Sequence, residues 1–120
     1  MAFAPLVTLT RRSDFLAAAR ARRRATAGFT LQARQRGADE PAEALRVGYT
    51  ASKKVGNAVA RNRAKRRMRA AARAVLPQAG VAGWDYVLIG RPGATADLPF
   101  ERLTADLAQA IAAIHRGRGR

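Results

Sequence analysis

The stretch SKKVGNAVARNRAKRRMR, from Ser52 to Arg69, concentrates lysine and arginine side chains in one short segment. Ammonium and guanidinium groups bind phosphate, and a guanidinium can also hold one phosphate through two hydrogen bonds or stack on an unpaired base. No aspartate or glutamate occurs between Ser52 and Val81. Because like charges one helical turn apart repel each other, we expect an external polyanion to compensate this segment.

A neutral amide, Asn62, separates Arg61 from Arg63 within the basic segment. An amide donates and accepts hydrogen bonds, so it can contact a base edge, a ribose 2′-hydroxyl or a hydrated metal ion. The lysines that precede the expected helix lie where free backbone N–H groups attract phosphate. The residues expected to contact nucleic acid are Lys53, Lys54, Asn57, Arg61, Asn62, Arg63, Lys65, Arg66, Arg69 and Arg73.

Helical periodicity predicts how this segment is anchored. We expect a helix from about Asn57 to Leu76, ended by Pro77 and the glycines that follow it. At about 100° per residue, one third of the helix is apolar and the opposite stripe is cationic. The expected buried face consists of Ala60, Ala64, Met68, Ala71, Ala72 and Val75, and the opposite stripe consists of Asn62, Arg66, Arg69 and Arg73.

Composition narrows the possible functions. The chain has 120 residues, with 23 Lys+Arg against 8 Asp+Glu, and a formal net charge of +15; nucleic acid is the partner that such a charge favours. Cysteine is absent, which excludes disulfides and thiolate metal sites. The carboxylates are scattered among loops and helix starts, where we interpret them as caps. We therefore expect no catalytic residue in the protein itself and no small-molecule substrate.

Targeting and membrane signals are also missing. No apolar run reaches the ~18 residues of a membrane span, so we expect no membrane partner and a cytoplasmic protein. His115 lies in the basic C-terminal sequence and is expected to be a solvated tail residue. We predict a single RNA-binding domain over residues 1–120, with an extended leader at 1–8 and a basic flexible tail at 115–120.

The remaining sequence predicts the elements that hold the basic helix. Ser13 as N-cap and Asp14 in the first turn predict a short Ala-rich helix that carries Phe15. Alternation of polar and apolar residues predicts a strand in the segment ATAGFTLQARQR, and residues 45–51 predict a second strand. In the second strand, Gly48 allows a bulge or a close backbone approach.

The C-terminal part predicts a buried strand and a helix. Residues 84–90 form a continuous apolar run, typical of a strand covered on both faces. After a loop with Asp97 as N-cap, an apolar stripe at helical spacing comprises Phe100, Leu103, Leu107, Ala110, Ile111 and Ile114. The order α-β-β(-β)-α-β-α predicts an α+β fold, a small two-layer α/β sandwich in which residues 45–51, the basic helix and residues 84–90 form a β-α-β unit.

The run RVGYTASKKVGNAVARNRAKRRMRAA, from Arg46 to Ala71, resembles the signature of the bacterial ribonuclease P protein subunit. That motif has an Arg-Asn-Arg core followed by a Lys-Arg pair and a further basic residue, here at Arg61, Asn62, Arg63, Lys65, Arg66 and Arg69. LTRRSDFLAAA, FTLQA and DYVLIGRPGA resemble the family's first helix, central strand and last strand. The resemblance covers about residues 9–115.

The resemblance implies a fold and a function. The fold would be similar to the second domain of ribosomal protein S5, with a left-handed β-α-β crossover that the usual right-handed rule mispredicts. The chain would be a subunit of an endoribonuclease that removes the 5′ leader of precursor tRNA. In that family a catalytic RNA performs the chemistry with magnesium, so Mg²⁺ would be a cofactor of the holoenzyme, and Asn62 would contact it as hydrated magnesium.

The resemblance also implies a cleft that binds the leader. By position, Phe15, Ala19, Thr30 and Gln32 would line it. The bulky or aromatic side chains common in the family are absent at Ala19, Thr30 and Gln32, which leaves Phe15 as the only ring. We therefore expect hydrogen bonds and charge to contribute more than base stacking, which is worth roughly 1–3 kcal/mol per base.

Three other functions remain open from the sequence. The first is a ribosomal or other structural RNA-binding protein of similar architecture, without a processing role. The second is a nuclease that acts through its own carboxylates. The third is a DNA-binding protein whose helix enters the major groove, which would show a base-sequence preference on duplexes.

Overall fold

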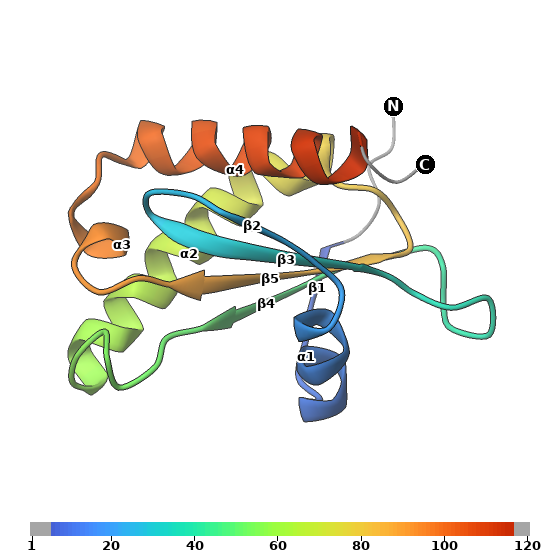
Figure 1. Cartoon of the computed structure of the whole chain (residues 1–120), viewed down its shortest axis with the longest axis horizontal. Helices are drawn as coiled ribbons and strands as arrows, with labels where there is room; N and C mark the ends of the chain where they lie inside the picture. The colour runs from blue at the N-terminus through green and yellow to red at the C-terminus, as the bar shows by residue number, and fades with distance from the viewer. Residues whose placement is uncertain (1–5, 117–120) are drawn as a thin grey trace.

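A computed structural model describes residues 6–116 of the chain, in which one five-stranded sheet is flanked by helices (Figure 1). The elements are β1 (Leu6–Thr8), α1 (Arg12–Ala19), β2 (Arg22–Ala25), β3 (Phe29–Gln35), β4 (Leu45–Thr50), α2 (Ala58–Ala79), β5 (Trp84–Gly90), α3 (Ala94–Asp97) and α4 (Phe100–Arg116). The strand order is β1-β4-β5-β3-β2. The predicted α+β sandwich is confirmed, with β1 and the short α3 as additional elements.

The basic helix α2 connects two neighbouring parallel strands, β4 and β5. In Figure 1 both strands run in the same direction, β5 lies above β4, and α2 passes behind the sheet, so the crossover is left-handed. Strand β1 is also parallel to β4, whereas β3 is antiparallel to both β5 and β2. The strands immediately before and after α2 in the chain are therefore neighbours in the sheet.

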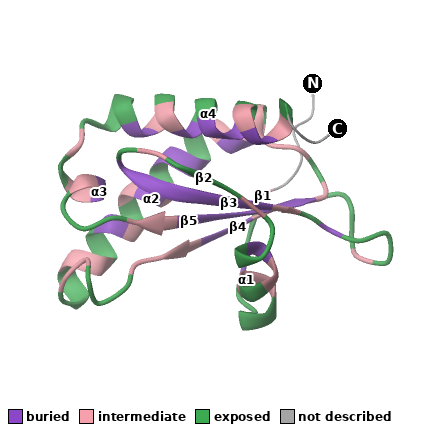
Figure 2. Cartoon of the chain, viewed as in Figure 1, coloured by how far each residue is buried: buried purple, intermediate pink, exposed green. Residues whose placement is uncertain are grey.

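The main core lies between one face of the sheet and the helices α2 and α4 (Figure 2). Met68, Ala71 and Ala72 of α2 are buried as predicted, while Ala60 and Val75 are only partly buried. In α4 the predicted stripe is buried from Leu103 onward, but Phe100 at its start is exposed. Because the apolar face of α2 packs on the core, the cationic stripe on the opposite side of the helix faces outward, as the periodicity predicted.

The opposite face of the sheet carries α1 and a second, smaller cluster. Leu9, Ala18 and Val87 are buried there, with Phe15 and Ile89 packed against them. The polar side chains of β3 lie on this same face, since Gln32 pairs with Val87 and Thr30 with Ile89 in the strand register. The prediction that the polar side of this strand faces away from the main core is confirmed.

Several predicted boundaries are wrong. Pro77 does not end α2, which continues to Ala79 and is followed by Gly80. A proline in the last turn loses one hydrogen bond, and here the N–H of Gly80 still reaches the carbonyl of Leu76 at 2.8 Å. Ser13 is not an N-cap, because α1 already begins at Arg12.

The described residues of the predicted leader and tail belong to regular elements. Thr8 and the two residues before it form β1, which pairs with β4, while residues 1–5 lie outside the described part of the chain. His115 belongs to α4 and is partly buried, with its ring centroid 4.4 Å from that of Trp84 and its Nε2 2.7 Å from the Tyr86 hydroxyl. The prediction of a solvated tail histidine is wrong, and residues 117–120 lie outside the description.

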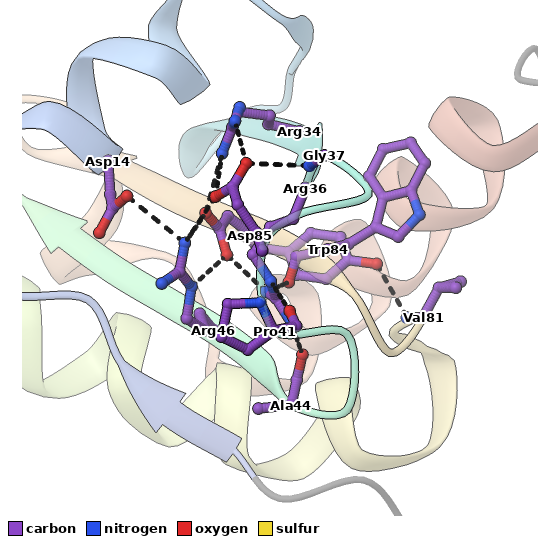
Figure 3. Close-up of polar contacts among 12 residues, drawn as sticks. Asp14, Arg34, Arg36, Gly37, Pro41, Ala44, Arg46, Val81, Trp84 and Asp85 are labelled. Carbon is purple, nitrogen blue, oxygen red and sulfur yellow. Dashed lines mark hydrogen bonds and ion pairs between the residues drawn. The ribbon is translucent and has the colours of Figure 1, made fainter.

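Asp85 is the second residue of β5, is fully buried and is surrounded by arginines (Figure 3). Its Oδ1 accepts hydrogen bonds from Arg36 Nη1 and Arg46 Nε, both at 2.7 Å, and its Oδ2 accepts one from Arg46 Nη2 at 2.7 Å. Arg36 also donates to the carbonyls of Pro41, Ala44 and Trp84. This network ties the loop before β4 to the sheet, so the interpretation of the carboxylates as helix caps is wrong for Asp85.

At the edge of this network, Glu40 receives hydrogen bonds from Arg34 Nη2 at 2.7 Å and from the Gly37 N–H at 2.9 Å. The hydrogen bond from Arg34, followed by that from Gly37, lowers the pKa of Glu40 from 4.5 to about 2. Because the folded-state pKa lies below the unfolded one, Glu40 stabilises the fold fully above pH ~4.5 and loses this contribution as pH falls toward 2.

We expect Glu40→Gln to destabilise the protein at pH 6 and to have progressively less effect as pH falls from 4.5 toward 2, since the carboxylate is then protonated in both states. Urea midpoints of the parent chain and the variant, measured from pH 7 to 2.5, check this. A gap between the two midpoints that stays constant over that range would contradict the assignment.

Candidate nucleic-acid interface

Helix α2 begins with a cap made by one of the predicted contact residues. The Oδ1 of Asn57 accepts a hydrogen bond from the Ala60 N–H at 2.9 Å. Before it, Lys53 and Lys54 are exposed in a turn, closed by hydrogen bonds from the Val55 and Gly56 N–H groups to the carbonyls of Ser52 and Lys53. The cap fixes Asn57 in the helix start and leaves only its amide N–H₂ group for a ligand.

The exposed face of α2 is charged and also contains a hollow. Val59, Asn62, Lys65, Arg66 and Arg69 line one open hollow along the helix. Asn62 and Arg66 are exposed, and Lys65 and Arg69 are partly exposed. Four of the predicted contact residues therefore share one surface, which we call the α2 surface. Its remaining basic members are Arg61, Arg63 and Arg73.

These charges are uncompensated in the described part of the chain. None of the lysines or arginines of the α2 surface lies within 4.0 Å of a carboxylate, whereas Arg34, Arg36 and Arg46 all do. Arg34, Arg36 and Arg46 thus pair with acids on the far side of the sheet, whereas the basic residues of the α2 surface face outward without acids. The amide of Asn62 makes no hydrogen bond to another described residue, so both its donor and its acceptor are available.

One arginine of the α2 surface is held by the sheet. The guanidinium carbon of Arg69 lies 5.2 Å from the ring centroid of Tyr49, at the end of β4. A cation over an aromatic face is worth about 0.5–1 kcal/mol at an exposed site. Burial raises the pKa of the Tyr49 hydroxyl, which keeps the ring neutral beside the guanidinium. Sequence reasoning assigned Tyr49 only to the strand.

Arg67 belongs to the same basic run but has a structural role. Its Nη1 donates to the carbonyl of Thr95 at 3.0 Å and to that of Ala96, and its Nη2 donates to the carbonyl of Leu98 at 2.6 Å. These carbonyls lie at the end of α3, so Arg67 ties α3 and the following turn to α2. This residue is not available as a phosphate ligand.

The predicted cleft is only partly assembled as expected. Phe15 lines an open apolar pocket together with Thr10, Arg12 and Thr50. Thr30 and Gln32 lie on the same face of the sheet but are 9% and 7% exposed, so they offer little surface to a ligand. Ala19 is exposed at the end of α1 and does not line the pocket, whereas its neighbour Ala18 is buried.

Sequence reasoning did not include three residues that line this pocket beside Phe15, namely Thr10, Arg12 and Thr50. Thr50 follows the predicted strand residue Tyr49 along β4, and Arg12 lies one helical turn before Phe15. Because side chains three residues apart share a helix face, placing Phe15 in the pocket would also have predicted Arg12 there. The pocket thus combines one aromatic ring with one cation and two hydroxyls, which suits a single-stranded nucleic acid.

Gly48 lets the Phe15 ring approach the sheet. A Cβ atom at residue 48 would lie 2.4 Å from Cε1 of Phe15, which is closer than two non-bonded carbon atoms can approach. We expect Gly48→Ala to lower the free energy of unfolding by about 1–3 kcal/mol through overpacking. In a Phe15→Ala background the same change should cost less than half as much, because the ring is gone. Equal costs in both backgrounds, measured by urea unfolding, would contradict this contact.

Residues 6–116 contain neither a cluster of metal-ligating side chains nor a membrane-spanning helix. No group of three or more histidine, aspartate or glutamate side chains is placed to hold a metal ion in that range. Within the same residues, no helix combines the length and apolar character that crossing a bilayer requires.

Comparison with known proteins places the chain in a family. The family model described as Ribonuclease P matches residues 3–115. The ribonuclease P protein component of Ruegeria pomeroyi is 63% identical over 107 residues, which cover 89% of this chain and 85% of that protein. The ribonuclease P protein component of Paramagnetospirillum magneticum is 49% identical over 110 residues, which cover 90% and 82%.

Solved structures share the fold at lower sequence identity. The RNase P protein of Staphylococcus aureus, at 22% identity, superimposes with a TM-score of 0.68 over 88% of this chain and 93% of that one. The RNase P protein of Thermotoga maritima, at 24% identity, gives a TM-score of 0.64 over 91% and 96%. The matching fold, the matched residues and the identity to curated relatives agree, and the chain belongs to the ribonuclease P protein family.

Proposed function

We propose that this chain is the protein component of a bacterial ribonuclease P and acts by binding RNA. The observation that carries the proposal is the α2 surface, where Arg66, Arg69 and Asn62 lie on one face without a compensating acid. The fold presents this surface outward, because the opposite face of α2 is buried from Ala64 to Leu76 against β4, β5 and α4. Its partner in the proposal is the catalytic RNA of the holoenzyme.

The proposed role of the protein is positioning, with the chemistry carried by the RNA. Phosphate contacts from arginine fix the register of a bound strand but do not cleave it. The second partner is precursor tRNA, whose 5′ leader would cross the pocket of Phe15, Arg12 and Thr50 on the other side of the sheet. One ring allows at most one stacked base there, so charge and hydroxyl contacts would supply most of the leader affinity. The protein would work in the cytoplasm, where precursor tRNA is made.

Magnesium is the cofactor of the proposed holoenzyme. The α2 surface offers one neutral oxygen ligand, on Asn62, among cations, and Mg²⁺ requires several hard oxygen ligands. The residues present therefore suit a magnesium ion held by RNA phosphates, with Asn62 accepting a hydrogen bond from a metal-bound water. They do not suit a site made by the protein alone.

Reconstitution tests the proposal. The purified chain, combined with a bacterial ribonuclease P RNA, should lower the magnesium concentration needed for leader removal. It should also strengthen binding of leader-bearing precursor relative to mature tRNA. The Asn62→Ala variant should assemble less tightly or need more magnesium. No effect of the parent chain on magnesium requirement or precursor binding would refute the proposal.

The ribosomal alternative is less favoured. The match to the Ribonuclease P model extends over residues 3–115 and includes both the α2 surface and the pocket on the opposite face. A structural protein of the ribosome would have no use for a preference between precursor and mature tRNA. Cosedimentation with ribosomal subunits at high salt, without that preference, would support the alternative.

A further inference from the structure

A second cationic surface lies at the opposite edge of the sheet from β1. The segment RARRRA, residues 20–25, leads into and forms β2, which among residues 6–116 pairs only with β3 and therefore presents one free edge. Arg23 and Arg24 of β2 are exposed, Arg20 is exposed just before β2 at the end of α1, and the exposed Arg102 of α4 lines a groove with Arg24. We call these four arginines the β2 edge surface. Neither the sequence motif nor the pocket near Phe15 includes any of them.

Arg22, in the middle of this segment, packs β2 against α4. Arg22 donates from Nη1 to the carbonyl of Ile114 at 2.7 Å, and its guanidinium carbon lies 6.0 Å from the ring centroid of Trp84. Arg22 thereby fastens β2 to the last turns of α4. Side chains alternate along a strand, so Arg24 points to the same side as Arg22, toward α4, and Arg23 points to the other.

The strand and the helix enclose a groove. Arg24, Thr26, Arg102 and Gln109 are among its lining residues, from β2, the turn after it and α4. The only acid in the groove is Asp106, whose carboxylate is engaged by Arg102 Nε at 3.1 and 3.2 Å. Arg20, Arg23 and Arg24 form no ion pair with any described residue. The groove itself is lined by two arginines, Arg24 and Arg102, against this one acid, so positive charge is in excess there.

We propose that the β2 edge surface is a second RNA-binding surface, which binds the phosphate backbone of the catalytic RNA at a place separate from the α2 surface. This inference rests on the proposed function for the identity of the RNA. The groove faces α4, whereas the pocket proposed for the leader lies on the α1 side of the sheet. The catalytic RNA, and not the leader, is therefore the partner that we assign to it.

An alternative explanation is that the charges on this edge strand only prevent it from pairing with the edge of another sheet. That role needs one or two charges, and lysine serves it as well as arginine. Here three exposed arginines lie within five residues, and a fourth comes from another element. Their repulsion opposes folding in a chain of net charge +15. Bound phosphate would compensate this repulsion, whereas arginines that only prevent pairing with another sheet would leave it uncompensated.

The first test compares salt dependence. Arg24→Gln/Arg102→Gln, which neutralises the two arginines that line the groove, should reduce the slope of log affinity for the catalytic RNA against log salt by about 1.4–1.8, since each lost phosphate contact accounts for about 0.7–0.9. The control Arg11→Gln/Gln35→Glu makes the same change in net charge at two exposed residues outside both surfaces. If the two doubles give equal slopes, the arginines act only through net charge and the proposal is wrong.

The second test locates the contact. The chain has no cysteine, so a single Cys can carry an iron chelate that cleaves nearby RNA. Gln109→Cys places it in the groove, and Ala70→Cys places it on exposed residue 70 of α2. We expect two separate sets of cleavages in the catalytic RNA. Cleavage from residue 70 alone, or cleavage from residue 109 only in precursor tRNA, would overturn the second surface and leave the proposed function intact. Absence of cleavage from both would overturn both proposals.

Discussion

Replacing Asp85 by asparagine is expected to lower the free energy of unfolding by about 3–5 kcal/mol, the usual cost of breaking a buried ion pair from one side. The side chains of Asp85 and Arg36 are 0% and 1% exposed, so water cannot replace the lost charge. Asparagine has nearly the same shape, so the loss reports charge and hydrogen bonding and not a cavity. Urea unfolding at pH 7 provides the measurement.

Asp106→Asn is the matched control for this variant. Asp106 also pairs with an arginine, Arg102, but that arginine is 55% exposed and lies one turn away on the same helix. Exposed pairs of this kind contribute about 0.3–0.5 kcal/mol. If Asp85→Asn lowers the free energy of unfolding no more than Asp106→Asn does, the arginines around Asp85 are not held by it.

Neutralising the centre of the α2 surface is expected to have the largest effect on RNA binding. Arg66→Gln/Arg69→Gln removes two cations from the hollow that also contains Asn62. A hydrogen bond to a charged group contributes about 1.5–3 kcal/mol, so affinity for the catalytic RNA should fall by about 100-fold or more. The slope of log affinity against log salt should also fall by about 1.4–1.8.

Two controls separate phosphate contacts from other effects. Arg11→Gln/Gln35→Glu changes the net charge equally and should alter affinity far less. Asn62→Ala, which removes no charge, should leave the salt slope nearly unchanged while weakening assembly or the response to magnesium. Binding should be measured at several salt concentrations, and the unfolding midpoint of each variant recorded, because Arg69 also contacts Tyr49. An Asn62→Ala slope as shallow as that of the double variant would refute this division of roles.

The sheet explains why the pocket near Phe15 is separate from the two proposed surfaces for the catalytic RNA. Alternation along β2 and β3 sends successive side chains to opposite faces, so Leu31 enters the main core while Gln32 faces α1. Helices α2 and α4 cover the first face and α1 the second, as Figure 1 illustrates. One thin domain can therefore present different chemistry on its two sides without a second core.

Local patterns in the sequence determined the elements and the α2 surface. The spacing of Ala64, Met68 and Ala71 fixed which side of α2 is buried, and hence that Asn62 and Arg66 face outward. Both follow from the 3.6-residue repeat of a helix, which does not depend on distant parts of the chain. The handedness of the crossover and the processing role came from the resemblance of the motif to a family, because periodicity has no handedness.

Only the tertiary structure decided which charges are free. Arg36, Arg67 and Arg66 look alike in the sequence, yet the first is buried on Asp85, the second binds the end of α3 and the third is exposed. The partners lie 28 to 49 residues away along the chain. An arginine is held or free according to which distant carboxylates and carbonyls the fold brings within hydrogen-bond reach, and no local spacing contains that information.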